Sequence, residues 1–332
     1  MNKSLISKDE STAIKGLLML LIILGHCSLL TFTDFVTRER FVWWHWLYTF
    51  HVYAFFILPF LYGCKQLSAR SYGLEAKKNF IKLYVPYFWF SIICAFFFYL
   101  SGSKLNPLEM CKAFVMGNEP LLAKTMGFHY LWFLPAMFAL LCIHHLYFNV
   151  SKSLKLFLIA LSIIVLALPL FLKGINLREF VPLAIIQGLS FAIYGIASRF
   201  IIITTDAIKY KKYLFVSLFL IASCLFFLGN GMNYILIYNL FMPVLFFCAL
   251  YQFRTSIARL SFLKLIGQYS LQIYLVHVII YNILFKVLVH YGETSLIMGI
   301  IVYVVTLSIS LIIAVLIKKS QVLSKIVFPD GK

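Results

Sequence analysis

Charged residues are scarce in this chain. Asp, Glu, Lys and Arg together make up 12% of its 332 residues, and only 11 residues are acidic. A soluble domain carries about 25% charged residues, so this sequence lacks the side chains for a normal water-exposed surface. Instead, 63% of the residues are hydrophobic and the mean hydropathy is +0.95. Such a composition requires lipid as its solvent, and we expect no soluble domain.

Three further absences narrow the class of protein. None of the seven cysteines forms a CxxC pair and most lie within apolar runs, so we expect small apolar filler. The apolar runs also lack the strict alternation of barrel strands, which leaves helices as the spanning elements. The net charge of +18 is spread between apolar runs rather than gathered in one patch, so nucleic acid is not an expected partner.

Ten apolar runs are each long enough to cross about 30 Å of hydrocarbon as a helix. The first run has no small-residue cleavage site after it, so we expect a retained span rather than a signal peptide. The sequence predicts an all-α polytopic transmembrane helical bundle without an internal repeat. The expected spans are residues 13–32, 44–64, 83–101, 128–148, 154–172, 180–203, 213–229, 233–252, 264–289 and 295–317.

The basic residues indicate how this bundle is oriented. Of the 29 lysines and arginines, 21 fall on the side of the N-terminus and seven on the other, with Lys286 inside a span. Cytoplasmic loops carry an excess of Lys and Arg, so both termini are predicted to be cytoplasmic. The longest connection, residues 102–127, lies on the opposite side and is expected to hold a short interfacial helix.

Three histidines are predicted at one depth. With a rise of about 1.5 Å per residue, His26, His51 and His277 each lie about 20 Å above the cytoplasmic edge. Ionisable residues inside spans usually face the bundle interior or a water-filled cavity and are functional hypotheses by default. The alternative is that each imidazole only bonds to a neighbouring helix. His129 begins the fourth span at the outer rim.

Lys15 shares a helix face with His26. Eleven residues make about 1100° of helix rotation, so the two side chains lie on one face, about 16 Å apart along the axis. A cation at the cytoplasmic mouth can hold a phosphate, and a neutral imidazole can accept the proton of an attacking hydroxyl. The plainer alternative for Lys15 is a snorkelling topology anchor. The three histidines could also bind a metal, but no HxxxH motif or carboxylate accompanies them, and none is expected.

Four motifs, in order along the whole chain, carry a family resemblance. "KGLLMLLIILGH" and "TFHVYAFFILPFLYG" resemble the first- and second-span signatures of the membrane acyltransferase-3 family. "HYLWFLPAMFALL" and "IGQYSLQIYLVHVII" are similar to its Leu-Trp-Phe-Leu-Pro-Ala and late-span histidine motifs. The nearest branch in character is that of the fucose 4-O-acetylases, a group of glycan O-acetyltransferases. Residues 1–332 would then form a single integral-membrane acyltransferase domain.

This resemblance implies transfer of an acetyl group from acetyl-CoA to a hydroxyl of a cell-envelope glycan or lipid-linked sugar, in the inner (cytoplasmic) membrane. By motif position, His26 matches the catalytic histidine, His51 the second-span histidine and Lys15 the basic, CoA-binding position. His129, Trp132 and His277 match later motifs and are expected to bind substrate.

The chain departs from the family pattern in two places. Lysine stands at position 15, where arginine is commoner, and it cannot make a bidentate fork to a phosphate. Residues 52–54 and 59–60 replace the usual Met-Pro-Leu and Ser-Gly of the second span.

Other function classes stay open at this point. They are a flippase or other transporter of lipid-linked sugar, a lipid-linked glycosyltransferase or polymerase, and a family member without catalysis. The spans contain almost no acidic residues, which argues against a carboxylate-driven pump.

Overall fold

The structure is a computed structural model, and it describes residues 4–27, 42–62, 68–171, 182–229, 231–290 and 296–329. Within these ranges the chain forms α-helices and short 3-10 helices, with no strand. The all-α prediction is therefore confirmed for the described part of the chain. Seven of its helices are long and apolar enough to cross a membrane: 71–100, 129–149, 183–204, 211–228, 231–251, 270–288 and 297–319.

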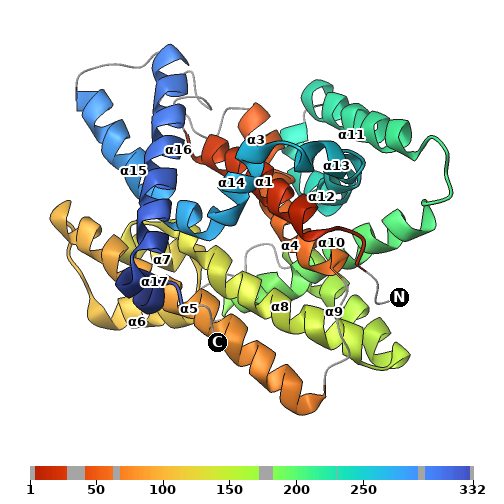
Figure 1. The fold of residues 1–332 in the computed structure, drawn as a ribbon, viewed down its shortest axis with the longest axis horizontal. Helices are drawn as coiled ribbons and strands as arrows, with labels where there is room; N and C mark the ends of the chain where they lie inside the picture. Colours follow the sequence, from red (N-terminus) through yellow and green to blue (C-terminus); the bar gives the residue numbers. More distant parts are fainter. Residues whose placement is uncertain are drawn as a thin grey trace. The chain divides into compact units, whose positions relative to one another are not determined.

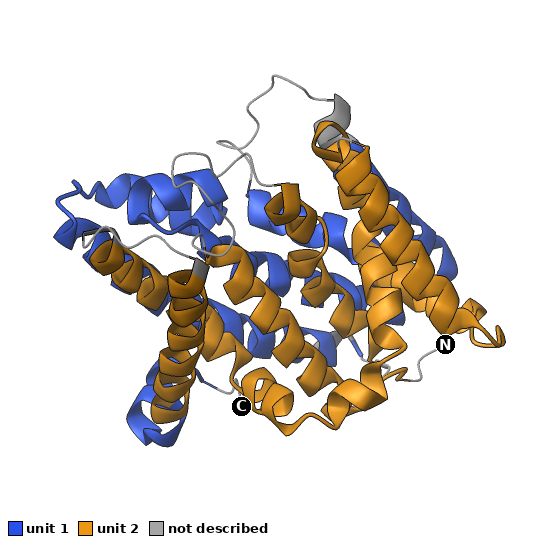
Figure 2. Ribbon diagram, turned by 90° about the horizontal axis from the view of Figure 1, so that it is seen from above, with its two compact units in different colours: residues 1–3, 63–193, 318–332 blue, residues 4–62, 194–317 orange. Residues whose placement is uncertain are grey.

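The chain divides into two compact units, drawn in blue and orange in Figure 2. Unit 1 comprises residues 1–3, 63–193 and 318–332, and unit 2 comprises residues 4–62 and 194–317. The helix α10 (Leu183–Thr204) runs through the boundary, so its first half belongs to unit 1 and its second half to unit 2. Each unit is described by itself below.

Unit 1 is built on three long helices and a group of short ones. Its elements are α5 (Ala69–Leu100), α6 (Pro107–Met116), α7 (Glu119–Met126), η2 (His129–Trp132), α8 (Phe133–Asn149), α9 (Lys152–Phe171), the start of α10, and α17 (Gln321–Val327). Asn106 caps α6 by accepting hydrogen bonds from the backbone of Leu108 and Glu109. Gly117 and Gly127 then end α6 and α7 in the left-handed conformation, which glycine adopts without strain.

Glycine also lets two long elements of unit 1 pack closely. A β-carbon at Gly188 of α10 would collide with the backbone carbonyl of Ala136 and lie 3.0 Å from the backbone nitrogen of Leu140, both on α8. Small residues at such contacts allow helix backbones to approach in a membrane, where the hydrophobic effect contributes little to association.

Unit 2 carries the N-terminal helix and most of the C-terminal half. Its elements are α1 (Lys8–His26), α3 (Val42–Tyr48), α4 (His51–Leu61), the end of α10, α11 (Lys211–Leu228), η4 (Gly231–Tyr234), α12 (Ile235–Tyr251), α13 (Arg254–Ala258), α14 (Ser261–Gln268), α15 (Ser270–His290) and most of α16 (Leu296–Lys319). A capping box begins α1, because Ser7 accepts from the backbone of Glu10 and the Glu10 carboxylate accepts from the backbone of Ser7.

The closest helix contact in unit 2 joins α1 to α14, which lie side by side in Figure 1. A β-carbon at Gly16 would collide with the carbonyl of Leu263, and one at Gly267 would collide with the carbonyl of Thr12. The two glycines therefore fit the two backbones together reciprocally. This contact fixes α1, and with it the histidine at its end, against the segment that leads into α15.

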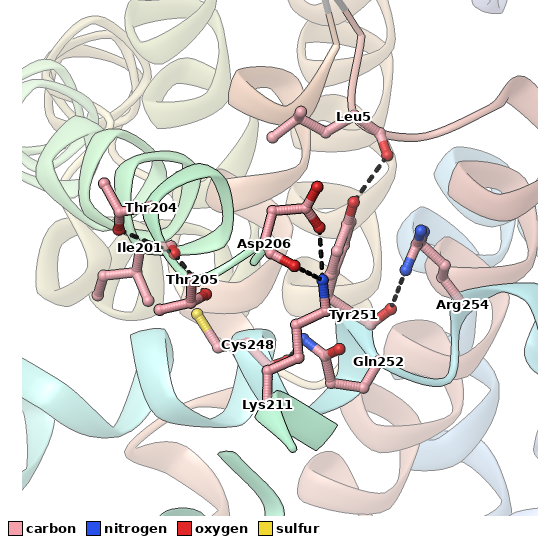
Figure 3. Close-up of polar contacts among 10 residues, drawn as sticks. All are labelled: Leu5, Ile201, Thr204, Thr205, Asp206, Lys211, Cys248, Tyr251, Gln252 and Arg254. Carbon is pink, nitrogen blue, oxygen red and sulfur yellow. Dashed lines mark hydrogen bonds and ion pairs between the residues drawn. The ribbon is translucent and has the colours of Figure 1, made fainter. Parts of the chain in front are cut away.

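Polar contacts tie the N-terminal segment to the end of α12 (Figure 3). The Tyr251 hydroxyl donates to the carbonyl of Leu5 at 3.0 Å, and Arg254 donates to the Tyr251 carbonyl at 3.1 Å. In the connection between α10 and α11, Lys211 donates to both the side chain and the backbone carbonyl of Asp206. This hydrogen bond from Lys211 holds the pKa of the Asp206 carboxyl below its usual range.

The structure revises several predicted span boundaries. The third span begins at Ala69 instead of residue 83, and the ninth is broken at Tyr269 into α14 and α15. The connection 102–127 holds two helices, α6 and α7, where one was expected. Three predicted spans are not among the seven candidates. The first corresponds to α1, the second to α3 and α4 together, and the fifth to α9. Predicted ends at 28–32, 63–64, 172, 180–181 and 295 lie outside the described residues.

Candidate functional site

His26 is the last residue of α1, and its half-buried ring lies among other rings of unit 2. The centroid of its imidazole is 5.2 Å from that of His277 on α15 and 6.4 Å from the ring of Tyr48 on α3. The ring of Tyr48 in turn lies 4.6 Å from that of His51, at the start of α4. The structure thus brings together all three histidines that the sequence predicted at one depth.

The hydrogen bonds of His51 and His277 define which ring nitrogen carries the proton. Nδ1 of His51 donates to the carbonyl of Leu47 at 2.7 Å, and Nδ1 of His277 donates to the carbonyl of Tyr274 at 2.7 Å. A carbonyl only accepts, so Nδ1 carries the proton in each neutral ring and the lone pair is on Nε2. Both side chains are fully buried. The His51 ring is thus held by α3, the helix before its own, and the His277 ring by an earlier turn of α15.

Gly25 gives the neighbouring side chains room at the end of α1. A β-carbon there would lie 3.1 Å from Nε2 of His51 and 3.1 Å from the ring of Tyr48. The Gly25 carbonyl accepts from Nε1 of Trp44 at 2.9 Å and from the Tyr48 hydroxyl at 3.4 Å. Such carbonyls at a helix end have no partner within the helix. The aromatic side chains of α3 therefore cap α1 next to His26.

A break in the second predicted span makes this arrangement. The chain leaves helical geometry at Thr49 and Phe50, between α3 and α4, so the expectation of one continuous span over 44–64 was wrong. The buried Thr49 hydroxyl donates to the carbonyl of Trp46 at 2.6 Å, which satisfies its polar group at the break. The break places Tyr48 and His51 in ring contact, three residues apart.

Sequence reasoning missed Trp44 and Tyr48. Their rings are tilted by 36° with centroids 4.1 Å apart, and both hydrogen-bond to the residue before His26. One signal was available, because a spacing of four residues places two aromatic side chains on the same face of a helix. The sequence before them gave no indication that this face would meet the end of α1.

Lys15 is half-buried on α1, next to the Gly16 contact with α14. Two further basic groups lie near the start of α1 and are paired with acids. Lys264 lies 3.6 Å from the Asp9 carboxylate, and Arg254 lies 3.4 Å from the Glu10 carboxylate. The Lys264–Asp9 pair is largely exposed, so it contributes little to stability and can exchange for another anion.

His129 and Trp132 belong to unit 1, whereas the three histidines belong to unit 2. They form the ends of the short helix η2, which leads directly into α8. The Trp132 ring packs edge-on against Phe191 of α10 and against Phe133, each with centroids 6.3 Å apart. Both residues are half-buried.

The described residues contain no group of three or more His, Cys, Asp or Glu side chains that could hold a metal ion. A neutral imidazole can accept a proton, which is the chemistry that the three histidines offer. His26 ends α1, so its ring stands at the helix terminus that carries a partial negative charge.

A family model described as an acyltransferase domain matches residues 9–319, which is nearly the whole chain. The match covers every candidate site residue, from Lys15 to His277. It confirms the resemblance at the level of the family and leaves the branch open. No curated protein and no solved structure matches the chain.

Proposed function

Because the chain belongs to the membrane acyltransferase-3 family, we propose that it is an O-acetyltransferase that modifies a sugar of the cell envelope. Acetyl-CoA is the donor, and the acceptor is a hydroxyl of a glycan or of its lipid-linked precursor. The observation that carries this proposal is the ring contact of His26 with His277 at the end of α1, beside a buried His51. This is a set of bases in a chain whose spans hold almost no acids.

In the proposed reaction, His26 accepts the proton of the attacking hydroxyl. The sugar oxygen forms a bond to the thioester carbonyl carbon, the carbon–sulfur bond breaks, and the CoA thiolate leaves and takes up a proton. General-base catalysis of this kind contributes about 10²–10⁴-fold to a rate. His51 and His277 orient or polarise the reacting groups through Nε2, because their Nδ1 atoms are bonded to carbonyls. Direct transfer and an acyl-enzyme route both fit these roles.

Lys15 is proposed to hold a phosphate of acetyl-CoA. It shares a face of α1 with His26, so a donor lying along α1 reaches from a cytoplasmic cation to the base. The half-buried Lys264 can assist if it exchanges Asp9 for phosphate. In unit 1, His129 and Trp132 are proposed to bind the acceptor. In unit 2, His277 is proposed as a substrate-binding residue next to His26. The topology that goes with this proposal has ten spans, both termini in the cytoplasm, and the inner membrane as its location.

Mass spectrometry of surface glycan from a deletion strain tests the reaction. The proposal predicts a loss of about 42 mass units, one acetyl group, per modified sugar. A plasmid with the native gene restores this mass, and one with His26→Ala does not. His145→Ala is the matched control, since His145 is half-buried in α8 and belongs to unit 1. Unchanged glycan acetylation with His26→Ala would remove the enzyme proposal in favour of a transporter or sugar-binding role.

A further inference from the structure

Figure 1 labels the helices α6 and α7 of unit 1. Asn118, in the turn between them, is an unusual residue. It stands at the N-cap of α7, a position where asparagine normally accepts a hydrogen bond from the first turn. Asn106 does so for α6, but the Asn118 side chain makes no such bond. The side chain is nevertheless fully buried, and neither Oδ1 nor Nδ2 has a hydrogen-bond partner among the described residues.

A buried amide without partners is destabilising, so native proteins rarely keep one unless something else binds it. The backbone carbonyl of Asn118 has a hydrogen-bond partner, because it accepts from the backbone of Leu122 at 2.8 Å at the start of α7. Only the side-chain amide lacks a hydrogen-bond partner among the described residues. Its two ends offer two donors and an acceptor, the set that matches neighbouring hydroxyls on a sugar ring.

The surroundings of Asn118 fit a sugar. Gly117 brings this turn against α8 and α10, since a β-carbon there would lie 3.3 Å from Pro135 and 2.8 Å from Ala184. Trp132, three residues before Pro135, packs against Phe191, which is two turns along α10 from Ala184. Residues seven apart lie on one face of a helix.

The half-buried Gln187 belongs to the same face of α10, because it is three residues from Ala184 and four from Phe191. The face of α10 that Gly117 approaches thus carries Gln187 and continues to Phe191, which packs against Trp132. Ligand sites of this kind combine apolar and aromatic surface with a few polar groups that fix orientation.

We propose that Asn118 binds hydroxyl groups of the glycan acceptor and contributes to the choice of sugar, with Trp132 packing against the ring and Gln187 as a second amide. This inference rests on the proposed O-acetyltransferase function, because that function supplies the sugar. It adds a residue that the family motifs do not include.

The test compares Asn118→Leu with Asn149→Leu, whose native amide already donates to the His145 carbonyl of its own helix. Membranes of the deletion strain carrying each variant receive radiolabelled acetyl-CoA and that strain's own envelope glycolipid, de-O-acetylated with mild alkali. Asn118→Leu is expected to raise the KM for glycolipid about 10-fold or more, which corresponds to about 1.4 kcal/mol. The KM for acetyl-CoA stays unchanged, and so do both constants of Asn149→Leu. Because an unpartnered amide is removed, the Tm of purified Asn118→Leu is not lowered.

An unchanged KM of Asn118→Leu for glycolipid would overturn the proposal. If the Tm of this variant were lowered as well, the native amide would be holding a buried water instead of a sugar. A parallel change in both KM values with a lowered Tm would also overturn it, since that indicates a general role in folding. Binding is measured separately, as the rise in Tm on adding the same glycolipid. If native protein binds glycolipid through Asn118 but transfers no acetyl group, the proposed function fails and the sugar site stands. If the glycolipid does not stabilise native protein, the sugar site fails.

Discussion

Replacing Gly16 with alanine tests how tightly the histidine cluster depends on the packing of α1. The added methyl group collides with the backbone carbonyl of Leu263 on α14. A carbonyl in a helix cannot rotate away, so the two helices must move apart. Overpacking of this kind destabilises by about 1–3 kcal/mol, and we expect the upper end here because both colliding groups are fixed.

The partner substitution Gly267→Ala meets the carbonyl of Thr12 in the same way. A single separation of α1 from α14 relieves both collisions. The double variant is therefore expected to be destabilised by less than the sum of the single variants. Displacing α1 also displaces His26 from His277, and a misplacement of about 1 Å can reduce a rate by about 10²-fold. Acetyl transfer should fall more than the folded fraction does.

The assay is unfolding in mixed micelles with increasing sodium dodecyl sulfate, followed by circular dichroism. Gly73→Ala is the control, because a β-carbon at Gly73 in α5 meets nothing within 4 Å. That variant should be more stable by about 0.5–1 kcal/mol, since alanine favours helix over glycine. If Gly16→Ala is as stable as Gly73→Ala, the close approach of α1 and α14 is refuted.

Three further substitutions probe single contacts. Trp44→Phe removes the hydrogen bond to the Gly25 carbonyl and should lower the unfolding free energy by about 1 kcal/mol in the same assay. Arg199→Met leaves the Phe60 carbonyl at the end of α4 without its 2.9 Å donor, and a loss of about 1–3 kcal/mol is expected; wild-type stability would contradict this. Lys211 lowers the pKa of Asp206, so this carboxylate stabilises the fold above its unfolded pKa of about 3.9 and less as pH falls below it. Asp206→Asn should therefore lose less stability than native protein between pH 5 and pH 2 in acid titrations, and equal losses would contradict the pairing.

The helical fold could be predicted from the sequence because lipid leaves few choices. Long apolar runs without charges must satisfy their backbone groups internally, and seven of the ten predicted spans have helices of spanning length. The predicted depths of His26 and His277 led to two rings that are in contact, 5.2 Å apart. The depths were predicted from the helical rise per residue, and the two rings are in contact even though the ninth span is broken at Tyr269.

The details of the site could not be predicted, because they depend on breaks in helices. Hydropathy does not distinguish a straight apolar helix from one that is interrupted at Thr49 and Phe50. Tyr48 enters the cluster only through that break. The sequence likewise gave no reason to single out Asn118, since an asparagine before an acidic first turn is typical of an ordinary helix cap. Only its burial without a partner singles it out.

The central claim is that His26 is the base of an acetyl transfer. Its most direct measurement is the rate of acetyl transfer from labelled acetyl-CoA to de-O-acetylated glycolipid by His26→Ala, at equal amounts of folded protein. The account predicts a rate about 10²–10⁴-fold below that of native protein, with His145→Ala unaffected. A His26→Ala protein that transfers acetyl groups at the native rate would contradict it.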